Sequence, residues 1–303
     1  MNRLLVTGLS GFVGRHLRQR LADGDTGWSL IEPQPHDLLD PASLDRWLEH
    51  ACPDAVVHLA GQTFVPEAFR NPQRTLEVNL LGTLNILQAL KRRGFAGAFL
   101  YVSSGDVYGQ VAEQALPISE GLVAHPRNPY AVSKLSSELL CEQWSYCEDW
   151  RIMTARPFNH IGPGQADSFV VPGVAMQLAQ IKLGRQDAVL NVGDIDVTRD
   201  FLDVQDVISA YLALLEHGRS GQTYNVCSGV ERSVREMIEQ MIGLSGLDVE
   251  IHQDPARFRK AEQRRVVGCA KKLHKETGWN PGVSITKTLQ AVLSDWEARV
   301  VEK

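Results

Sequence analysis

Two side chains in the segment PYAVSKLSSELL have the types and the spacing of a catalytic pair. Tyr130 and Lys134 are four positions apart in a helix-like pattern, so a helix would present both on one face. A phenol has a pKa of about 10, and a neighbouring ammonium group favours its ionised form and lowers that pKa. A tyrosine adjusted in this way can exchange a proton with a substrate oxygen while a hydride moves to or from the adjacent carbon. The pair therefore indicates oxidoreductase chemistry.

A serine supplies the third candidate group. The segment YVSSGDVYG ends a predicted strand, where Ser104 can donate a hydrogen bond to the reacting oxygen. Ser103 points the opposite way if the strand pleat continues, so it is the weaker catalytic candidate. Ser104 could instead cap the junction of strand and loop, because serine hydroxyls also bond their own backbone. The Y-x-x-x-K spacing alone is common on helices, so the assignment depends on its surroundings.

Three glycines in LLVTGLSGFVGRHL predict a dinucleotide-binding turn. Gly8, Gly11 and Gly14 have the spacing G-x-x-G-x-x-G and lie in the first turn between a strand and a helix. Glycines let the backbone turn sharply and approach a pyrophosphate, whose charge then lies at a helix N-terminus. Tight turns also need glycine, but the position in the first strand–turn–helix unit favours dinucleotide binding.

The residues that would distinguish NADH from NADPH leave the choice open. Glu32 closes the second predicted strand, where an acidic residue would bind the adenosine ribose 2′-hydroxyl and favour NADH. No arginine is expected to sit beside Glu32 to hold a 2′-phosphate, but a solvated strand end explains Glu32 equally well. Asp37 could accept a hydrogen bond from the adenine amino group, or it could serve the start of the next helix.

Apolar runs of strand length alternate with helix-like segments through the first half of the chain. Runs such as AVVHLA and FLYVS suit a sheet that is buried on both faces. The alternation predicts an α/β fold of the Rossmann type, a doubly wound parallel sheet that binds ligands at the carboxyl ends of its strands. The predicted strands are Arg3–Thr7, Trp28–Ile31, Ala55–Leu59, Ala98–Ser103 and Arg151–Ala155. The predicted helices are Gly11–Leu21, Ala42–His50, Pro72–Arg92 and Tyr130–Tyr146.

The pattern changes after Phe158, where the Gly/Pro-rich stretch NHIGPGQADSF precedes shorter strands and helices. We therefore expect residues 1–157 to form the dinucleotide-binding domain. Residues 158–303 should form mainly a smaller C-terminal lobe, with a late strand near Thr223–Val226 returning to the large sheet.

Composition narrows the class of protein. The chain has 303 residues, of which 44% are hydrophobic and 22% charged, as in ordinary globular proteins. No apolar run approaches the ~20 residues of a membrane helix or resembles a signal peptide, so we expect a cytoplasmic protein without a membrane partner. The net charge of −5 argues against a nucleic-acid partner. Scattered cysteines predict neither disulfides nor a metal site; they are Cys52, Cys141, Cys147, Cys227 and Cys269.

The chain resembles the extended short-chain dehydrogenase/reductase family over nearly its whole length. The motifs that carry this resemblance are TGLSGFVG, HLAGQT, VSSGDVYG, YAVSK, ARPFNHIGPG and TRDFLDVQDV. The segments HLAGQTFVPEAF, RPFNHIGPG and RKAE are similar to the branch that acts on GDP-linked 4-keto-6-deoxyhexoses. The resemblance implies NAD(P)H-dependent reduction of the C4 ketone of GDP-4-keto-6-deoxy-D-mannose to GDP-D-rhamnose. NADPH is the implied cofactor, with NADH as the alternative, and the face of hydride attack stays open.

The resemblance also implies roles for individual residues. The catalytic residues would be Ser104, Tyr130 and Lys134. The cofactor-binding residues would be Gly8, Gly11, Phe12, Val13, Gly14, Asp37, Leu38, Leu59, Ala60, Gly61, Gln62, Ser103, Tyr130, Lys134 and Pro157. The substrate-binding residues would be Gly105, Asp106, Tyr130, Asn159, Arg199, Arg259 and Glu262. Each of these arginines could instead be a surface salt-bridge partner.

Other functions remain open at this point. A GDP-mannose 4,6-dehydratase needs a further acid/base pair after the catalytic serine, often Asp-Glu in the family, where this chain has Gly105 and Asp106. Glycine cannot transfer a proton and Asp106 is one methylene shorter than the family glutamate, so reduction is favoured. Another nucleotide-sugar epimerase or reductase is a second alternative. A non-catalytic NAD(P) sensor of this fold would typically lack the Tyr130–Lys134 pair.

Assembly and two histidines complete these expectations. The family generally associates through the helix that carries the Tyr/Lys pair and through its neighbour, which implies a homodimer or homotetramer. His58 is expected to be a hydrogen-bonded core histidine, and His160 to line the pocket without a chemical role. The leucines on the two predicted helices exceed what one sheet face requires; they are Leu80, Leu81, Leu84, Leu87, Leu139 and Leu140.

Overall fold

Six parallel strands form the central sheet of the computed structural model, which describes residues 1–257 and 263–301. Their order is β2-β1-β3-β4-β5-β9, and every neighbouring pair is parallel. The predicted α/β fold with a doubly wound parallel sheet is confirmed. The strands are β1 (Asn2–Thr7), β2 (Trp28–Leu30), β3 (Ala55–His58), β4 (Ala98–Val102), β5 (Arg151–Pro157) and β9 (Gln222–Val226).

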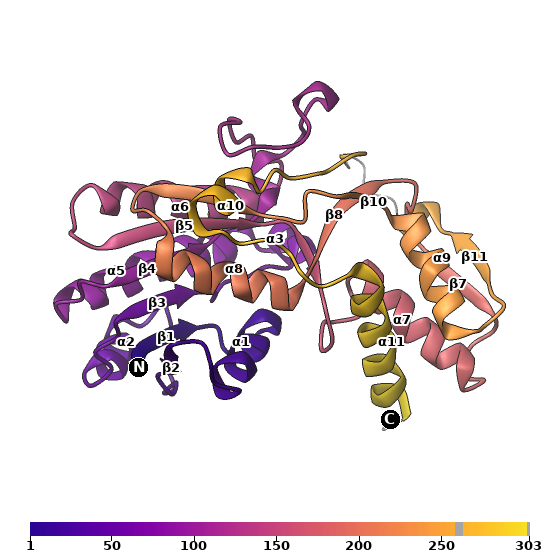
Figure 1. Cartoon of the computed structure of the whole chain (residues 1–303), viewed down its shortest axis with the longest axis horizontal. Coiled ribbons are helices and arrows are strands. Elements are labelled where there is room, and N and C mark those ends of the chain that lie inside the picture. Colours follow the sequence, from indigo (N-terminus) through magenta and orange to yellow (C-terminus); the bar gives the residue numbers. More distant parts are fainter. Residues whose placement is uncertain (258–262, 302–303) are drawn as a thin grey trace.

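Helices cover both faces of this sheet, as Figure 1 shows. Side chains alternate along β1, so that Leu4 and Val6 enter one apolar core and Leu5 enters the other. The first core is completed by α1 (Phe12–Ala22), α8 (Val204–His217) and α10 (Lys271–Thr277). The second is completed by α2 (Pro41–Leu48), α5 (Gly82–Arg92) and α6 (Pro129–Ser145).

The segment predicted as one helix over Pro72–Arg92 is divided in the structure. It consists of α4 (Pro72–Leu76), a π-helical turn η1 (Glu77–Leu81) and α5, and α3 (Val65–Arg70) precedes it. A π-helical turn bonds i to i+5 and so shifts the helix face that follows it; such turns are frequent at functional sites. Here Asn79, in the middle of the turn, is almost fully buried.

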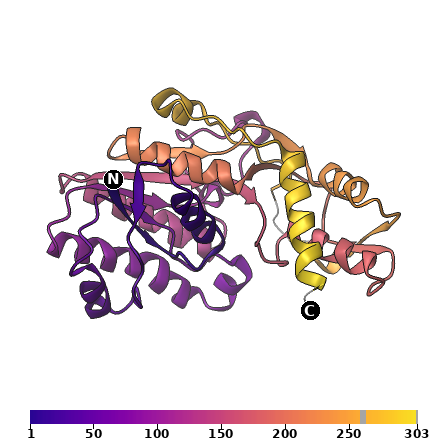
Figure 2. The ribbon, with the colours of Figure 1, turned by 60° about the horizontal axis from the view of Figure 1, so that its bottom comes forward.

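The chain after β5 builds a smaller lobe around a core of its own, which lies beside the large sheet in Figures 1 and 2. Its strands are β6 (Asn159–Ile161), β7 (Val189–Val192), β8 (Thr198–Asp203), β10 (Glu231–Ser233) and β11 (Glu250–Gln253), in two sheets of order β10-β8-β6 and β11-β7. Its helices are α7 (Val170–Lys182), α9 (Val234–Ser245) and α11 (Ile285–Val301). The short turns η2 (Gly105–Tyr108), η3 (Glu113–Ala115) and η4 (Pro255–Arg257) complete the structure.

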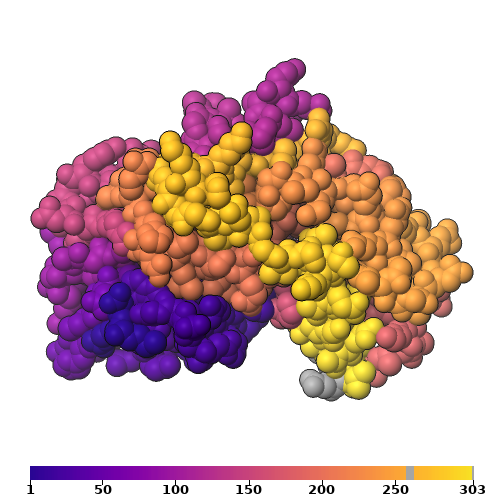
Figure 3. Space-filling view, in the orientation of Figure 1, coloured from indigo at the N-terminus to yellow at the C-terminus, as the bar shows by residue number. Residues whose placement is uncertain are grey.

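The two parts are interwoven in sequence. Besides β9, which pairs with β5, the helices α8 and α10 leave the smaller lobe and pack on the large sheet. Figure 3 shows a notch between the N-terminal part and α11 at the lower edge of the molecule. Within the described ranges, no helix combines the length and the apolar character needed to cross a membrane.

Candidate active site

Strand β1 leads directly into a glycine turn that lies very close to the end of β3. Gly8 has a φ of +78°, and a Cβ there would lie 2.8 Å from the Ala60 nitrogen. A Cβ on Gly14 would lie 2.3 Å from the Gly8 carbonyl oxygen, so only glycine lets α1 pack this closely on the turn. Gly11 stands at the N-cap of α1 and provides no side-chain cap. The first N–H groups of α1 are therefore available to an anionic ligand.

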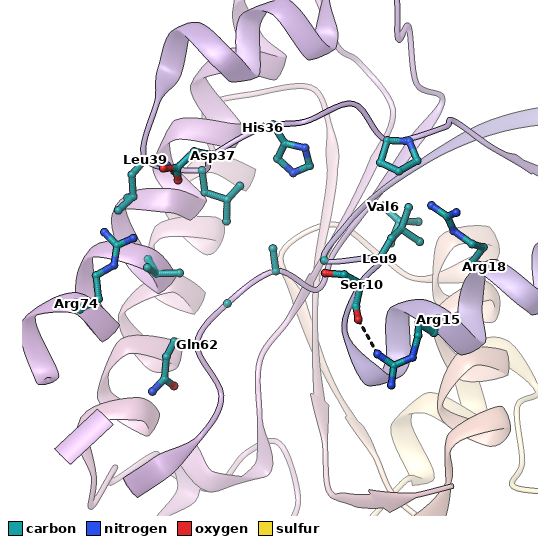
Figure 4. Close-up of a pocket in the computed structure, with 16 residues that line it drawn as sticks. Val6, Leu9, Ser10, Arg15, Arg18, His36, Asp37, Leu39, Gln62 and Arg74 are labelled. Atoms are coloured by element: carbon teal, nitrogen blue, oxygen red, sulfur yellow. Dashed lines mark hydrogen bonds between the residues drawn. The ribbon is translucent and has the colours of Figure 1, made fainter. Parts of the chain in front are cut away.

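A cavity of about 1170 Å³ opens beside this turn, and Figure 4 shows the side chains around it. Its wall includes the guanidinium groups of Arg15 and Arg18 from α1 and of Arg74 from α4. Guanidinium forks match the geometry of phosphate oxygens, so this wall suits a phosphorylated ligand. The remaining lining residues are Val6, Gly8, Leu9, Ser10, Pro33, His36, Asp37, Leu38, Leu39, Ala60, Gly61, Gln62 and Val78.

The expectation that no arginine sits beside Glu32 is wrong. The Glu32 side chain is 78% exposed, and Arg18 of α1 lies 3.8 Å from its carboxylate. An arginine therefore stands beside Glu32 in space, although none adjoins it in the sequence. The i,i+3 spacing of Arg15 and Arg18, which puts both on one face of α1, was the available signal. Asp37 lines the cavity and uses one carboxylate oxygen to accept a hydrogen bond from the Leu39 N–H at 2.9 Å.

The three predicted catalytic side chains meet at the carboxyl end of β4. The Asn128 side chain caps α6 by accepting a hydrogen bond from the Ala131 N–H at 2.8 Å. This start of α6 places Tyr130 and Lys134 on its buried side. The Lys134 Nζ donates to the Val102 carbonyl at 2.8 Å, and the Ser104 hydroxyl lies near enough to the Tyr130 phenol to lower its pKa.

Ser104 has the capping role that the sequence left open, and its catalytic role stays a prediction. Its Oγ accepts a hydrogen bond from the Asp106 N–H at 3.1 Å and thereby caps the short turn η2. The same hydroxyl lowers the pKa of Tyr130, so capping fixes its position without removing it from the neighbourhood of the phenol.

Burial dominates the electrostatics of the catalytic pair. It raises the pKa of Tyr130 above the ordinary value of 10.0; the Ser104 hydroxyl lowers this pKa in part, whereas Asp106 raises it further. Burial also lowers the pKa of Lys134 from 10.5 to about 8, although the nearby Glu138 raises it. The expectation that Lys134 lowers the Tyr130 pKa is therefore wrong for this structure, in which burial raises that pKa.

A buried amide joins the loop after β3 to the catalytic helix. The Asn79 side chain accepts from the Gln62 N–H at 2.7 Å and donates to the Gln62 carbonyl at 2.9 Å. It also donates to the Ser133 hydroxyl at 2.8 Å, which in turn donates to the Tyr130 carbonyl at 2.7 Å. The sequence did not predict a role for Asn79. The regular helix expected over Pro72–Arg92 gives no reason for the Asn79 amide to point inward.

His58 lies at the centre of a second buried chain of hydrogen bonds. Its Nδ1 is 2.7 Å from the Thr7 hydroxyl and its Nε2 is 3.0 Å from the Thr83 hydroxyl. The Thr7 oxygen accepts from the Ala60 N–H, and Thr83 donates to the Asn79 carbonyl at 2.5 Å. Since each hydroxyl has one proton, Thr7 donates to Nδ1 and the Nε2–H donates to Thr83. Burial lowers the pKa of His58 to about 3 and keeps it neutral, as expected of a core histidine.

Polar atoms without partners mark the remaining predicted cofactor contacts. The Ser103 Oγ and the Gln62 Oε1 are buried and have no hydrogen-bond partner among the described residues. Because unpaired buried polar atoms are costly, a bound ligand would complete their hydrogen bonds.

Phe12 stacks on His160 with 6.1 Å between ring centroids, which connects α1 to β6. Burial lowers the pKa of His160. Val13 and Leu59 pack on the first core, Leu38 and Ala60 belong to the second, and Pro157 ends β5.

The residue after Ser104 has little room for a side chain. A Cβ on Gly105 would lie 3.3 Å from the Phe158 ring, so a larger residue requires the ring to move. Asp106 is exposed, and its Oδ2 lies 3.4 Å from the Asn128 amide nitrogen. The two positions thus offer one carboxylate at the rim of the site.

Two predicted substrate residues lie in the smaller lobe. Asn159 of β6 is opposite Phe201 of β8, and Arg199 is two residues before Phe201. Side chains alternate along a strand, so Asn159 and Arg199 share one face of this sheet. The Arg199 Nη1 donates to the Thr198 carbonyl at 2.7 Å. Arg259 and Glu262 lie outside the described residues.

Comparisons with known proteins show which family this chain belongs to. The family described as GDP-mannose 4,6 dehydratase matches residues 31–292. The sequence is 64% identical to the GDP-6-deoxy-D-mannose reductase of Pseudomonas aeruginosa over 99% of both chains. It is 31% identical to the GDP-6-deoxy-D-talose 4-dehydrogenase of Aggregatibacter actinomycetemcomitans, covering 89% of this chain and 90% of that one.

A solved structure of RMD from Pseudomonas aeruginosa complexed with NADPH has the same fold. The two superpose with a TM-score of 0.95 at 61% identity, covering 99% of this chain and 100% of that one. The agreement therefore extends from the motifs to the whole architecture, and the chain belongs to the GDP-mannose 4,6-dehydratase family, as its resemblance to the extended short-chain dehydrogenases/reductases predicted.

Proposed function

We propose that this protein is an oxidoreductase that uses NADPH to reduce the C4 ketone of GDP-4-keto-6-deoxy-D-mannose, giving GDP-6-deoxy-D-mannose, also called GDP-D-rhamnose. The observation that carries the proposal is the 64% identity, over 99% of both chains, to a GDP-6-deoxy-D-mannose reductase. The assembled Ser104, Tyr130 and Lys134 provide the groups that this reaction needs.

The residues around the glycine turn fit a dinucleotide. Glycine at positions 8 and 14 lets the turn pack closely on the end of β3 and on α1, and the uncapped N-terminus of α1 offers N–H donors to a pyrophosphate. The unpaired Ser103 and Gln62 atoms lie on loops that adjoin the catalytic groups. The exposed guanidinium group of Arg18 supplies the charge that a 2′-phosphate requires, which favours NADPH over NADH.

The proposed roles follow from the order of the groups along the site. When bound, NADPH supplies the hydride that adds to the C4 carbon. Tyr130 donates its phenolic proton to the oxygen that becomes an alkoxide, and Ser104 holds that oxygen by a hydrogen bond. The Lys134 ammonium group then faces the tyrosinate and stabilises its charge. The same ammonium group can hold the ribose hydroxyls of the nicotinamide.

The packing at Gly105 favours reduction over dehydration. Dehydration must also remove a proton from C5 and expel water from C6, so it needs two further proton-transfer groups. A Cβ at position 105 would lie 3.3 Å from the Phe158 ring, so an acidic side chain there requires the ring to give way, and Asp106 is a single carboxylate. Reduction needs only the hydride, Tyr130 and a hydrogen-bond donor to the oxygen.

The same proposal assigns one ligand to each of the two parts of the chain. Residues 1–157 would bind the dinucleotide, and residues 158–303 would contribute most contacts to the sugar nucleotide. Asn159 and Arg199, on one face of the small sheet, support this assignment. A cytoplasmic location is proposed on the composition of the chain.

We also propose that the protein forms a homodimer or homotetramer through α6 and the neighbouring η1–α5 segment. Val132, Leu139 and Tyr146 recur every seven residues along α6 and are exposed, as is Leu81 on η1. Such a stripe of exposed apolar side chains suits a helix-to-helix interface. Of the six leucines on which the sequence expectation relied, only Leu81 and Leu139 are exposed, and Leu87 is fully buried.

The test of the activity uses two separate reactions. One contains GDP-mannose with oxidised cofactor, and the other contains GDP-4-keto-6-deoxy-D-mannose with NADPH. We expect cofactor oxidation in the second reaction only, with NMR of the product distinguishing the rhamno from the talo configuration at C4. Efficient ketone formation from GDP-mannose would instead establish a dehydratase. No turnover in either reaction, with NADPH still bound, would favour a non-catalytic NAD(P) sensor or an enzyme whose substrate is another nucleotide sugar.

A further inference from the structure

A buried ion pair joins the catalytic helix α6 to the neighbouring strand β5. Its members, Glu138 and Arg156, are only 5% and 8% exposed. The Arg156 Nε donates to the two carboxylate oxygens at 3.0 and 3.1 Å, and its Nη2 donates to Oε2 at 2.5 Å. Taking two charges out of water costs free energy that their attraction often does not recover, so such a pair is weak evidence of stability. The pair therefore needs an explanation other than stability.

The helix places this carboxylate beside the catalytic lysine. Glu138 follows Lys134 by four positions on α6, and both side chains are buried, so they lie on the same inner face of the helix. Side chains at this spacing are neighbours, with Cβ atoms about 5–6 Å apart. An anion at such a distance favours the charged form of an amine. In agreement with this geometry, burial lowers the pKa of Lys134 and Glu138 raises it.

The other titratable groups around the Lys134 ammonium group supply no negative charge at neutral pH. The Tyr101 ring of β4 lies 5.2 Å from Nζ, and burial raises the pKa of its phenol well above 10.0. Burial also raises the pKa of Cys141 and of Tyr130 on α6, and it keeps His58 of β3 neutral. Among the described residues whose charge acts on Lys134, the carboxylate of α6 is thus the one anion.

Arg156 also connects the ion pair to the turn that Ser104 caps. Its guanidinium group lies 4.8 Å from the centre of the Tyr108 ring, which belongs to η2. The Tyr108 hydroxyl donates to the side-chain oxygen of Asn225 on β9 at 2.7 Å. Since Arg156 contacts both α6 and η2, it holds the Glu138 carboxylate in one place relative to the catalytic groups.

We infer that Glu138 is a positioning residue whose carboxylate, held in place by Arg156, keeps the buried Lys134 side chain positively charged. The inference deepens the proposed function and rests on it, because that function needs Lys134 as an ammonium group. The charge is used twice, to hold the ribose hydroxyls of the nicotinamide and to stabilise the tyrosinate of Tyr130. Glu138 acts on both through Lys134.

The test measures the NADPH dissociation constant of the full chain from pH 6 to pH 10. A neutral amine holds hydroxyl groups less tightly than an ammonium group does, so wild-type affinity should fall as the pH rises through the Lys134 pKa of about 8. The double variant Glu138→Leu/Arg156→Met removes both charges and leaves neither partner buried alone. Its affinity should fall about one to two pH units lower, because a charge at this spacing changes proton affinity about ten- to a hundredfold.

Three further variants make this reading specific. Glu142→Gln is the matched control, since Glu142 is the next carboxylate along α6 and is exposed; its affinity should fall at the wild-type pH. Glu138→Asp, which keeps the charge one methylene farther from Lys134, should move the fall by less than the double variant does. Lys134→Met should show no fall in this range.

A purely structural ion pair predicts a different result. The double variant should melt at or above the wild-type temperature, because apolar side chains often replace a buried pair without loss of stability. If the pair were only structural, the affinity of this variant would fall at the same pH as that of the wild type, and that result would overturn the inference. The measurement needs no keto sugar, so it separates failure here from failure of the proposed reduction.

Discussion

Replacing Lys134 by methionine should stabilise the protein while it removes activity. Burial lowers the pKa of Lys134 from 10.5 to about 8, which means that the folded state holds this proton less tightly than the unfolded chain does. At pH 7 the ammonium group therefore costs about 3 kcal/mol of folding free energy, at 1.36 kcal/mol per pKa unit. The variant also leaves the Val102 carbonyl without its donor, which costs about 1–3 kcal/mol.

The sign of the pH dependence separates these two contributions. Because the folded pKa is depressed, stability from Lys134 titration is fully present above pH 10.5 and is lost as the pH falls through about 8. The loss of the Val102 bond is the same at every pH. Relative to wild type, Lys134→Met should therefore be more stable at pH 7 than at pH 10 by about 2.5 kcal/mol.

Urea denaturation of both proteins at pH 7 and pH 10 measures this difference. Lys287→Met, at an exposed position of α11, is the control and should show no such change between the two pH values. A stability difference between Lys134→Met and wild type that is the same at both pH values would refute the argument. In assays at pH 7, the variant should lose both turnover and NADPH affinity; normal affinity would limit Lys134 to adjusting Tyr130.

Four further outcomes are expected. Tyr130→Phe should lower kcat about 10²–10⁴-fold with unchanged NADPH binding, since only the proton donor is lost, and a residual rate above about a tenth would contradict the acid role. Arg18→Gln should raise KM for NADPH about tenfold and leave KM for NADH unchanged, with Arg20→Gln on the same helix as the control; equal effects on both cofactors would exclude 2′-phosphate recognition. Gly105→Glu should not create dehydratase activity and should lower the melting temperature, because the new side chain meets Phe158; ketone formation from GDP-mannose by this variant would show that the ring yields. Leu139→Arg should shift light scattering toward the monomer, and a wild-type protein that is already monomeric at micromolar concentration would disprove the proposed assembly.

The sequence by itself determined the fold class and the common face of Tyr130 and Lys134, because both depend on local patterns. Unbroken apolar runs predicted the buried parallel strands to within one or two residues at most ends, since a sheet covered on both faces leaves few polar positions. The i,i+4 spacing of Tyr130 and Lys134 fixed their common face on α6. The three glycines predicted the tight turn after the first strand, because such a turn needs residues without a Cβ.

Only the tertiary structure decided which distant residues meet. It brought Arg18 beside Glu32, turned Asn79 inward through a π-helical turn and set Arg232 opposite Arg199. It also sent α8 and α10 back onto the large sheet, which the composition of the second half did not indicate. The physical reason is that these contacts depend on strand register and helix packing between segments far apart in the chain, whereas periodicity and spacing report only on neighbours within one element.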